Sequence, residues 1–315
     1  MLNKKYLYIA IVLVGVIVGL LVIVLERLWA PTQKQTSLIE HSQKEKLLSS
    51  SNGIHVHGVP FEDQELFFKS VGNYPIQEKN NTVDVMGGIV PHHLLPSFII
   101  ADFFSRLSSQ EINTIILVGP NHYERGGAHV ITSHYAWETP LGVLESDNEI
   151  VSRLEEGKLA NAEENIISLD HSMTAILPFI KYYLPDVKVA PLILSRKVDV
   201  QEIGTLAEAL KKYLQTNKAV LVASVDFSHY LTNIEAKQKN EESLVAIEKR
   251  SYGEIFNFGN DHMDSPSSIS LLLKTMDALG ADKMSVLHDT NSGELFGNDR
   301  SQTTSYLSLL FAGGK

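Results

Sequence analysis

Three runs of β-branched residues and leucines each end in a histidine, and this repeated pattern constrains the fold more than any other feature. The runs are Asp84–His93, Thr114–His122 and Ala219–His229. Continuous apolar runs of this kind are typical of strands buried on both faces of a parallel sheet. Because ligands of open α/β sheets bind beyond the carboxyl ends of the strands, the pattern predicts that the three histidines converge on one site.

Strands alternate with helices along the rest of the chain. Further strands are predicted at Ala128–Ser133, Val187–Leu194, Met284–Leu287 and Ser305–Phe311. Helices are predicted at Glu62–Val71, Pro96–Leu107, Asn148–Glu155, Ser172–Leu184, Val200–Leu214, Ile234–Arg250 and Ser267–Leu279. Tyr135–Leu144 contains turn-forming residues and is expected to be a loop. The alternation predicts a three-layer α/β domain, with a central, largely parallel or mixed β-sheet between helices, over residues 54–315.

The amino terminus carries an uncharged, apolar run at Tyr6–Leu25. It is long enough to span a bilayer as a helix and longer than the h-region of a signal peptide. Lys4 and Lys5 precede it, so the positive-inside rule places residues 1–5 in the cytoplasm. We therefore predict a single-pass anchor in the cytoplasmic membrane. A cleaved signal peptide is the alternative, although Leu28–Pro31 is a poor cleavage site.

Residues 26–53 are polar and are predicted to link this anchor to a domain outside the cytoplasm. The net charge of −10 is spread along the chain and argues against a nucleic-acid partner. The chain has no cysteine, which excludes disulfides, iron–sulfur clusters and thiolate-bound zinc. A metal site would have to use histidine, aspartate, glutamate or water.

The strand ends supply the first candidate residues. His92 and His122 each closely follow a proline that ends a strand, and a ligand role is favoured for both. His93 is expected to point to the opposite side from His92, so the pair is not expected to bind one metal. Asp226 could orient an imidazole or a metal-bound water, or merely satisfy backbone donors in a turn. His229 could transfer a proton.

Two more candidates lie outside the strands. His171 stands between Asp170 and Ser172, and each of these two is more often a helix cap than a catalyst, with Ser172 a plausible N-cap of the following helix. No Gly-x-Ser-x-Gly motif is present, which disfavours a serine hydrolase. Asp264 could be a carboxylate ligand or could begin a helix cap with Ser265. These residues predict a histidine-rich site with one or two aspartates, suited to Fe(II), Zn(II) or another divalent ion.

A further pair, His55 and His57, alternates as in a strand and therefore shares one face. A surface strand is the favoured interpretation of this short piece, ahead of a second metal site.

Five ordered motifs resemble those of the Memo-like family, whose microbial members are called AmmeMemoRadiSam system protein B. The motifs are Val90-Pro91-His92, Gly119-Pro120-Asn121-His122, Thr139-Pro140-Leu141-Gly142, His171-Ser172 with Leu177-Pro178-Phe179, and Ser224-Val225-Asp226-Phe227-Ser228-His229. The resemblance covers Ile54 to Ala312. It implies a fold similar to the LigB-type class III extradiol dioxygenases, which are non-haem iron enzymes with a central sheet between helices.

The resemblance also implies roles for individual residues. His92 and His122 match the two metal-binding histidines of the family, and His229 matches the acid/base histidine of the dioxygenases. Asp226 and His171 match further pocket residues, which we group with His229 as catalytic candidates.

This chain departs from the family in two places. After the first strand it has Pro91–Leu95 where the family commonly has Pro-His-Ala-Gly-Tyr. The family's third ligand is often the cysteine of a Cys-Gly-Arg-x-Pro-Ile segment, and placing Ile269 against the final isoleucine puts Asp264 at that position. His92, His122 and Asp264 would then form a two-histidine, one-carboxylate site.

Three functions follow as hypotheses. The leading one is a membrane-anchored, metal-binding protein with redox activity at non-haem iron, with Fe(II) as the expected metal and Zn(II) or Cu as alternatives. The second is an extracytoplasmic zinc hydrolase. The third is a non-enzymatic module that binds a metal or a peptide. The expected partners are the membrane, through the amino-terminal helix, and an unknown small molecule or peptide.

Overall fold

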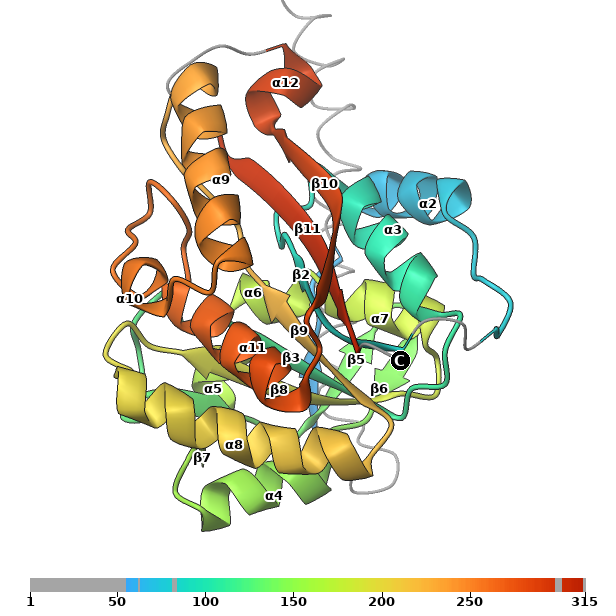
Figure 1. Cartoon of the computed structure of the whole chain (residues 1–315). Helices are drawn as coiled ribbons and strands as arrows, with labels where there is room; N and C mark the ends of the chain where they lie inside the picture. The colour runs from blue at the N-terminus through green and yellow to red at the C-terminus, as the bar shows by residue number, and fades with distance from the viewer. Residues whose placement is uncertain (1–54, 62, 81–83, 298–301, 314–315) are drawn as a thin grey trace, which may run out of the picture. The chain divides into compact units, whose positions relative to one another are not determined.

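The computed structural model describes residues 55–313, apart from residues 62, 81–83 and 298–301. Within these residues a mixed sheet of eight strands has the order β10-β11-β2-β9-β3-β8-β4-β7 (Figure 1). The four central strands run parallel to one another. In sheet order these are β2 (Val85–Val90), β9 (Ala219–Ser224), β3 (Thr114–Pro120) and β8 (Lys188–Leu194). The predicted mixed sheet between helices is confirmed.

Both edges of the sheet are antiparallel to its centre. On one side β11 (Ser305–Ala312) pairs with β2, and β10 (Lys283–Asn291) pairs with β11. On the other side β4 (Val130–Thr132) pairs antiparallel with β8 and carries β7 (Asn161–Ala162) parallel to itself. The parallel strands are therefore covered on both edges, and their carboxyl ends all lie at one end of the sheet.

Helices cover both faces because each central strand is apolar on both sides. Along β3, Ile116 and Val118 pack in one core, whereas Ile115 and Leu117 pack in the other, as the two-residue period of a strand requires. The first core is completed by α4 (Asn148–Glu156), α8 (Val200–Thr216) and α11 (Pro266–Leu279). The second is completed by α2 (Gln64–Asn73), α3 (Ser97–Leu107) and α7 (Leu177–Tyr183). The remaining helices of the described residues are α5 (Glu164–Ile167), α6 (His171–Thr174), α9 (Asn233–Glu248), α10 (Tyr252–Ile255) and α12 (Ser292–Phe296).

The predicted loop at Tyr135–Leu144 is wrong, because this segment forms a hairpin. β5 (Ala136–Thr139) pairs with β6 (Gly142–Leu144), and β5 also pairs in parallel with β1 (Val56–Gly58). Gly142 adopts a φ of 117°, which glycine alone accepts readily, so the turn residues close a hairpin. Trp137 is fully buried in the second core and anchors this small sheet.

The predicted helix at Ser172–Leu184 is interrupted. It divides into α6, which ends at Thr174, and α7, which begins at Leu177. Pro178 explains the break, because it lacks an N–H and its ring conflicts with the carbonyl four residues earlier, that of Thr174.

The prediction that the strand bearing His57 lies on the surface is also wrong. His57 is 8% exposed, and its Nε2 lies 2.7 Å from Glu164 Oε2 and 3.2 Å from Ser133 Oγ. The imidazole thus joins the small sheet to α5.

None of the helices between residues 55 and 313 combines the length and the apolar character needed to cross a bilayer. The predicted anchor at Tyr6–Leu25, the cytoplasmic tip and the linker lie outside the described residues.

Candidate functional site

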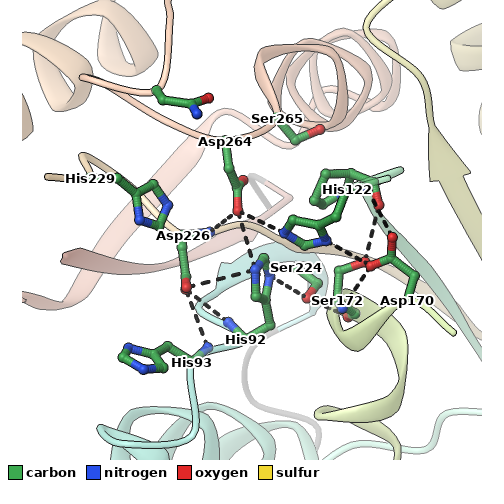
Figure 2. A network of polar contacts seen from close by, with 12 residues as sticks. His92, His93, His122, Asp170, Ser172, Ser224, Asp226, His229, Asp264 and Ser265 are labelled. Carbon is green, nitrogen blue, oxygen red and sulfur yellow. Dashed lines mark hydrogen bonds and ion pairs between the residues drawn. The ribbon is translucent and has the colours of Figure 1, made fainter. Parts of the chain in front are cut away.

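The histidines after β2 and β3 meet at the carboxyl end of the sheet (Figure 2). Their rings, those of His92 and His122, pack edge to face with centroids 4.9 Å apart. β3 packs closely against α6 because residue 119 is a glycine. A Cβ at Gly119 would lie 2.7 Å from Ser172 Oγ. This glycine lets α6 bring a third imidazole, that of His171, into the group.

His92 is 3% exposed, and both its backbone and its ring are held by polar contacts. Its backbone N–H donates to Asp226 Oδ1 (3.0 Å), and its Nδ1 lies 3.3 Å from Ser224 Oγ. Ser224 donates its own hydrogen to the carbonyl of Ser172 (2.6 Å), so its hydroxyl can only accept from Nδ1–H of His92. In the neutral imidazole, Nε2 therefore carries an unshared lone pair.

His122 is fixed in the same tautomer by Asp170. Nδ1 of His122 donates to Asp170 Oδ1 (2.8 Å), and the backbone N–H of His122 donates to Oδ2 (2.9 Å). Asp170 also accepts from the backbone N–H and the hydroxyl of Ser172, so of the two predicted cap residues it is Asp170 that caps α6. This arrangement leaves Nε2 of His122 free, as in carboxylate–histidine–metal groups.

Asp264 faces the two free nitrogens. Its Oδ2 lies 3.2 Å from Nε2 of His92 and 3.7 Å from Nε2 of His122. Its Oδ1 is buried and has no hydrogen-bond partner among the described residues. The predicted helix cap involves Ser265 alone, which caps α11 by accepting from Ser268 N–H, and the side chain of Asp264 takes no part in it. An antiparallel bridge between Phe227 and Met263 fixes this segment against the end of β9.

Electrostatics at the site depend on the two carboxylates that flank His122. Burial alone would lower the pKa of His122, but its hydrogen bonds with Asp170 and Asp264 outweigh that effect and raise the pKa to about 9. Burial would likewise raise the pKa of Asp264, but the charges and hydrogen bonds of His92 and His122 hold it below its usual range. The site therefore attracts a positive charge between these three side chains.

His171 has the opposite electrostatic character. Its ring stacks on that of His122 with centroids 3.9 Å apart. Burial and the positive charges of the nearby His122 and His92 lower the pKa of His171 to about 4, so the imidazole of His171 is neutral at pH 7.

Asp226 and His229 lie at the end of β9 beside this group (Figure 2). Asp226 Oδ1 accepts from the backbone N–H groups of His92 and His93, and Oδ2 lies 3.7 Å from Nε2 of His92. His229 lines the same cavity, and burial lowers its pKa. His93 points away, and its Nδ1 lies 2.6 Å from the hydroxyl of Tyr306.

Two groups in the described part of the chain could hold a metal ion. One consists of His92, His122 and His171, and the other of His92, Asp226 and Asp264. In each group the ligand atoms lie within 4.8 Å of one another. The donor set fits a divalent cation, because Nε2 of His92 and Nε2 of His122, each on a ring whose Nδ1 is already bound, face the carboxylate of Asp264, and a cation can take the place of the protons that they share with it.

The orienting role of Asp170 was missed by sequence reasoning, which treated it as a cap. A carboxylate at the start of a helix gives the same sequence signal whether it caps the helix or also holds an imidazole. His262 lies outside the site, because it stacks on Phe258 with centroids 3.9 Å apart and its Nε2 lies 2.9 Å from Glu242 Oε2.

Known proteins resemble this chain over most of its length. A MEMO1 family protein of Pyrobaculum aerophilum is 31% identical over 239 residues, which cover 72% of this chain and 84% of the relative. One of Aquifex aeolicus is 29% identical over 229 residues, covering 71% and 84%. The crystal structure of an uncharacterized protein from Escherichia coli K12 shares the fold, with a TM-score of 0.51 and 12% identity over 71% of this chain and 99% of that one. The model of the Memo-like protein family matches residues 65–310, and the chain belongs to this family.

Proposed function

We propose that the chain binds a divalent metal ion through Nε2 of His92, Nε2 of His122 and the carboxylate of Asp264. The observation that carries this proposal is the convergence of the two free nitrogens on Asp264 Oδ2, at 3.2 and 3.7 Å, beside a buried Oδ1 without a partner. Leaving such a carboxylate oxygen unpaired in the interior is costly, and a bound cation would remove that cost.

Fe(II) is the metal we propose first, and a redox reaction of a small molecule or peptide is the activity. Two imidazoles and one carboxylate are a set that non-haem Fe(II) sites use, and a bound iron supplies redox chemistry with positions left open for a substrate and O₂. The protein's own contribution is orientation by Asp170, which fixes His122, and proton transfer by His229, whose lowered pKa keeps the imidazole neutral and able to accept a proton near pH 7. Asp226 directs one oxygen, Oδ2, toward His92. This oxygen would share the proton that His229 accepts.

A second candidate is a zinc hydrolase that uses His171 as a third nitrogen ligand. The stacked ring of His171 brings its nitrogen within 4.8 Å of those of His92 and His122. Three imidazoles are a frequent zinc set, and the low pKa of His171 keeps its lone pair available.

The anchor is part of the proposal. The apolar run Tyr6–Leu25 and the two lysines before it support a single-pass protein with the large domain outside the cytoplasm. Reporter fusions at Lys315 test this orientation, and a cytoplasmic signal from a reporter that is active only in the cytoplasm would refute it.

Metal analysis of the full chain purified without added metal tests the site. We expect bound iron in the wild type, and loss of that iron in Asp264→Ala and His92→Ala. Asp261→Ala is the matched control, because Asp261 is an exposed carboxylate three residues away and should leave the metal content unchanged. Zinc that is lost in His171→Ala would favour the hydrolase, and a metal content that Asp264→Ala leaves intact would remove Asp264 from the site.

A further inference from the structure

The cavity above the metal-ligand candidates is larger than an ion requires. It has a volume of about 500 Å³, which is the size of pockets that take small organic ligands. Apolar and aromatic side chains form much of its wall, and they include Leu194, Val198, Phe256 and Phe258. Among the described residues that line it, one lysine or arginine is present, Arg196, in the loop between β8 and α8.

Arg196 is held in place at this wall. Its backbone N–H donates to Glu124 Oε1 (2.8 Å), and its Nη2 donates to Asn260 Oδ1 (2.5 Å). The backbone carbonyl of Asn260 accepts from the N–H of His229 (2.9 Å). Asn260 therefore fixes the guanidinium relative to the end of β9.

The guanidinium has donors to spare. A guanidinium carries five N–H donors in a rigid fork, and Asn260 takes one of them. Glu124, a carboxylate in the loop between β3 and β4, accepts from the backbone N–H of Arg196 and from Ser195 Oγ (2.6 Å). Within the described residues no carboxylate forms an ion pair with the Arg196 side chain. A planar cation without an anionic partner, on the wall of a cavity, matches a ligand carboxylate.

Tyr230 gives the mouth of the cavity an aromatic edge. It is 75% exposed, and its φ of 61° lies in the left-handed region that a residue with a side chain rarely adopts. Its ring centroid is 5.8 Å from that of His229. Strained residues of this kind cluster at ligand sites, and here the conformation presents an aromatic ring beside the proposed acid/base histidine.

We infer that this cavity binds a small aromatic carboxylate, with its carboxylate on Arg196 and its ring against Tyr230, Phe256 and Phe258. The inference rests on the proposed function, because a divalent ion offsets the charges of Asp226 and Asp264. The third carboxylate of the wall, Glu124, is bound to Ser195 Oγ and to the backbone N–H of Arg196, so the guanidinium is left to bind the anion. The ring of the bound ligand would then extend from Arg196 toward the metal ligands.

Calorimetric titration of the metal-loaded full chain tests this with two probes of the same shape. 4-Hydroxybenzoate carries a carboxylate, and 4-hydroxybenzamide carries a neutral amide in its place. We expect the wild type to prefer the benzoate, and Arg196→Gln to weaken benzoate binding roughly tenfold or more while leaving benzamide binding unchanged. Arg196→Lys should retain part of the preference, because it keeps the charge but not the fork.

Arg125→Gln is the matched control. It removes the same charge from an exposed arginine that lies over the ring of Tyr123, 5.4 Å from its centroid, and does not line the cavity. Equal affinity of the wild type for both probes, or binding of neither, overturns the inference, as does a preference that Arg196→Gln leaves intact. Metal content measured on the same samples separates the two ideas: a wild type without metal refutes the proposed function, whereas a metal-loaded wild type without the preference refutes only the anion site.

Discussion

Replacing Asp170 with asparagine is the perturbation that the site geometry predicts most sharply. Asp170 is fully buried, and its two oxygens accept from Nδ1 and the backbone N–H of His122 and from the hydroxyl and backbone N–H of Ser172. All four partners are donors. In Asp170→Asn, therefore, whichever way the amide is turned, its nitrogen meets a backbone N–H, that of His122 or that of Ser172.

The expected cost follows from these contacts. A buried, unsatisfied N–H costs about 1–3 kcal/mol, and loss of the charge from the bond to His122 adds about 1–2 kcal/mol. We expect the free energy of unfolding to fall by about 3 kcal/mol. Because His122 also loses the partner that fixes its tautomer, metal affinity should fall by about 10- to 100-fold.

Urea unfolding and competition with a metal chelator measure the two effects separately. Asp102→Asn is the matched control, because Asp102 is also buried and its carboxylate accepts from His288 Nε2 (2.8 Å) and Arg106 Nε (3.0 Å), away from the site. This control should lose stability without losing metal affinity. If Asp170→Asn binds metal as tightly as Asp102→Asn, the role assigned to Asp170 in orienting His122 is refuted.

Two further predictions concern packing and pH. Gly119→Ala places a Cβ 2.7 Å from Ser172 Oγ, so we expect a loss of about 1–3 kcal/mol in urea unfolding, whereas Gly204→Ala, whose Cβ meets nothing within 4 Å, should be neutral or stabilising. In chelator-treated protein the pKa of His122 is raised from 6.5 to about 9, so its stabilisation is fully present below pH 6.5 and is lost as the pH rises through 9. Unfolding free energies measured from pH 6 to pH 9 should fall in the wild type and should fall less in His122→Asn; equal slopes would contradict the assignment.

The sequence allowed the central sheet to be predicted because strands buried on both faces must be apolar along their whole length. The ends of β2, β3 and β9 could be placed for the same reason, since parallel strands bring their carboxyl ends to one edge. The hairpin of β5 and β6 could not be predicted, because Pro140 and Gly142 are equally compatible with an open loop and with a tight turn. Burial of Trp137 decided between them, and burial depends on the tertiary fold.

Long-range polar contacts were the part that the sequence did not reveal. The carboxylate that binds His57 belongs to Glu164, which comes 107 positions later in the sequence. The one that binds His122 belongs to Asp170, which comes 48 positions later. A strand pattern specifies which residues stand at its end but not which carboxylate another loop supplies. The residues alone left Asp264 open between a ligand and a helix cap, and a short local match favoured the ligand. The geometry that supports it arises from α11 and the bridge between Phe227 and Met263.

The two aspartates beside His92 differ in how fully their oxygens are used, and this difference favours different roles for them. Asp226 Oδ1 accepts from two backbone N–H groups and so ties the turn after β2 to the end of β9. Asp264 Oδ1 accepts from none, and the backbone donor of its Oδ2, the N–H of Asp226, lies 3.3 Å away. A metal ion competes poorly for an oxygen already held by two donors and well for one that has none. Asp226 is therefore better suited to hold the strand ends together and keep one oxygen facing His92, and Asp264 to bind the ion.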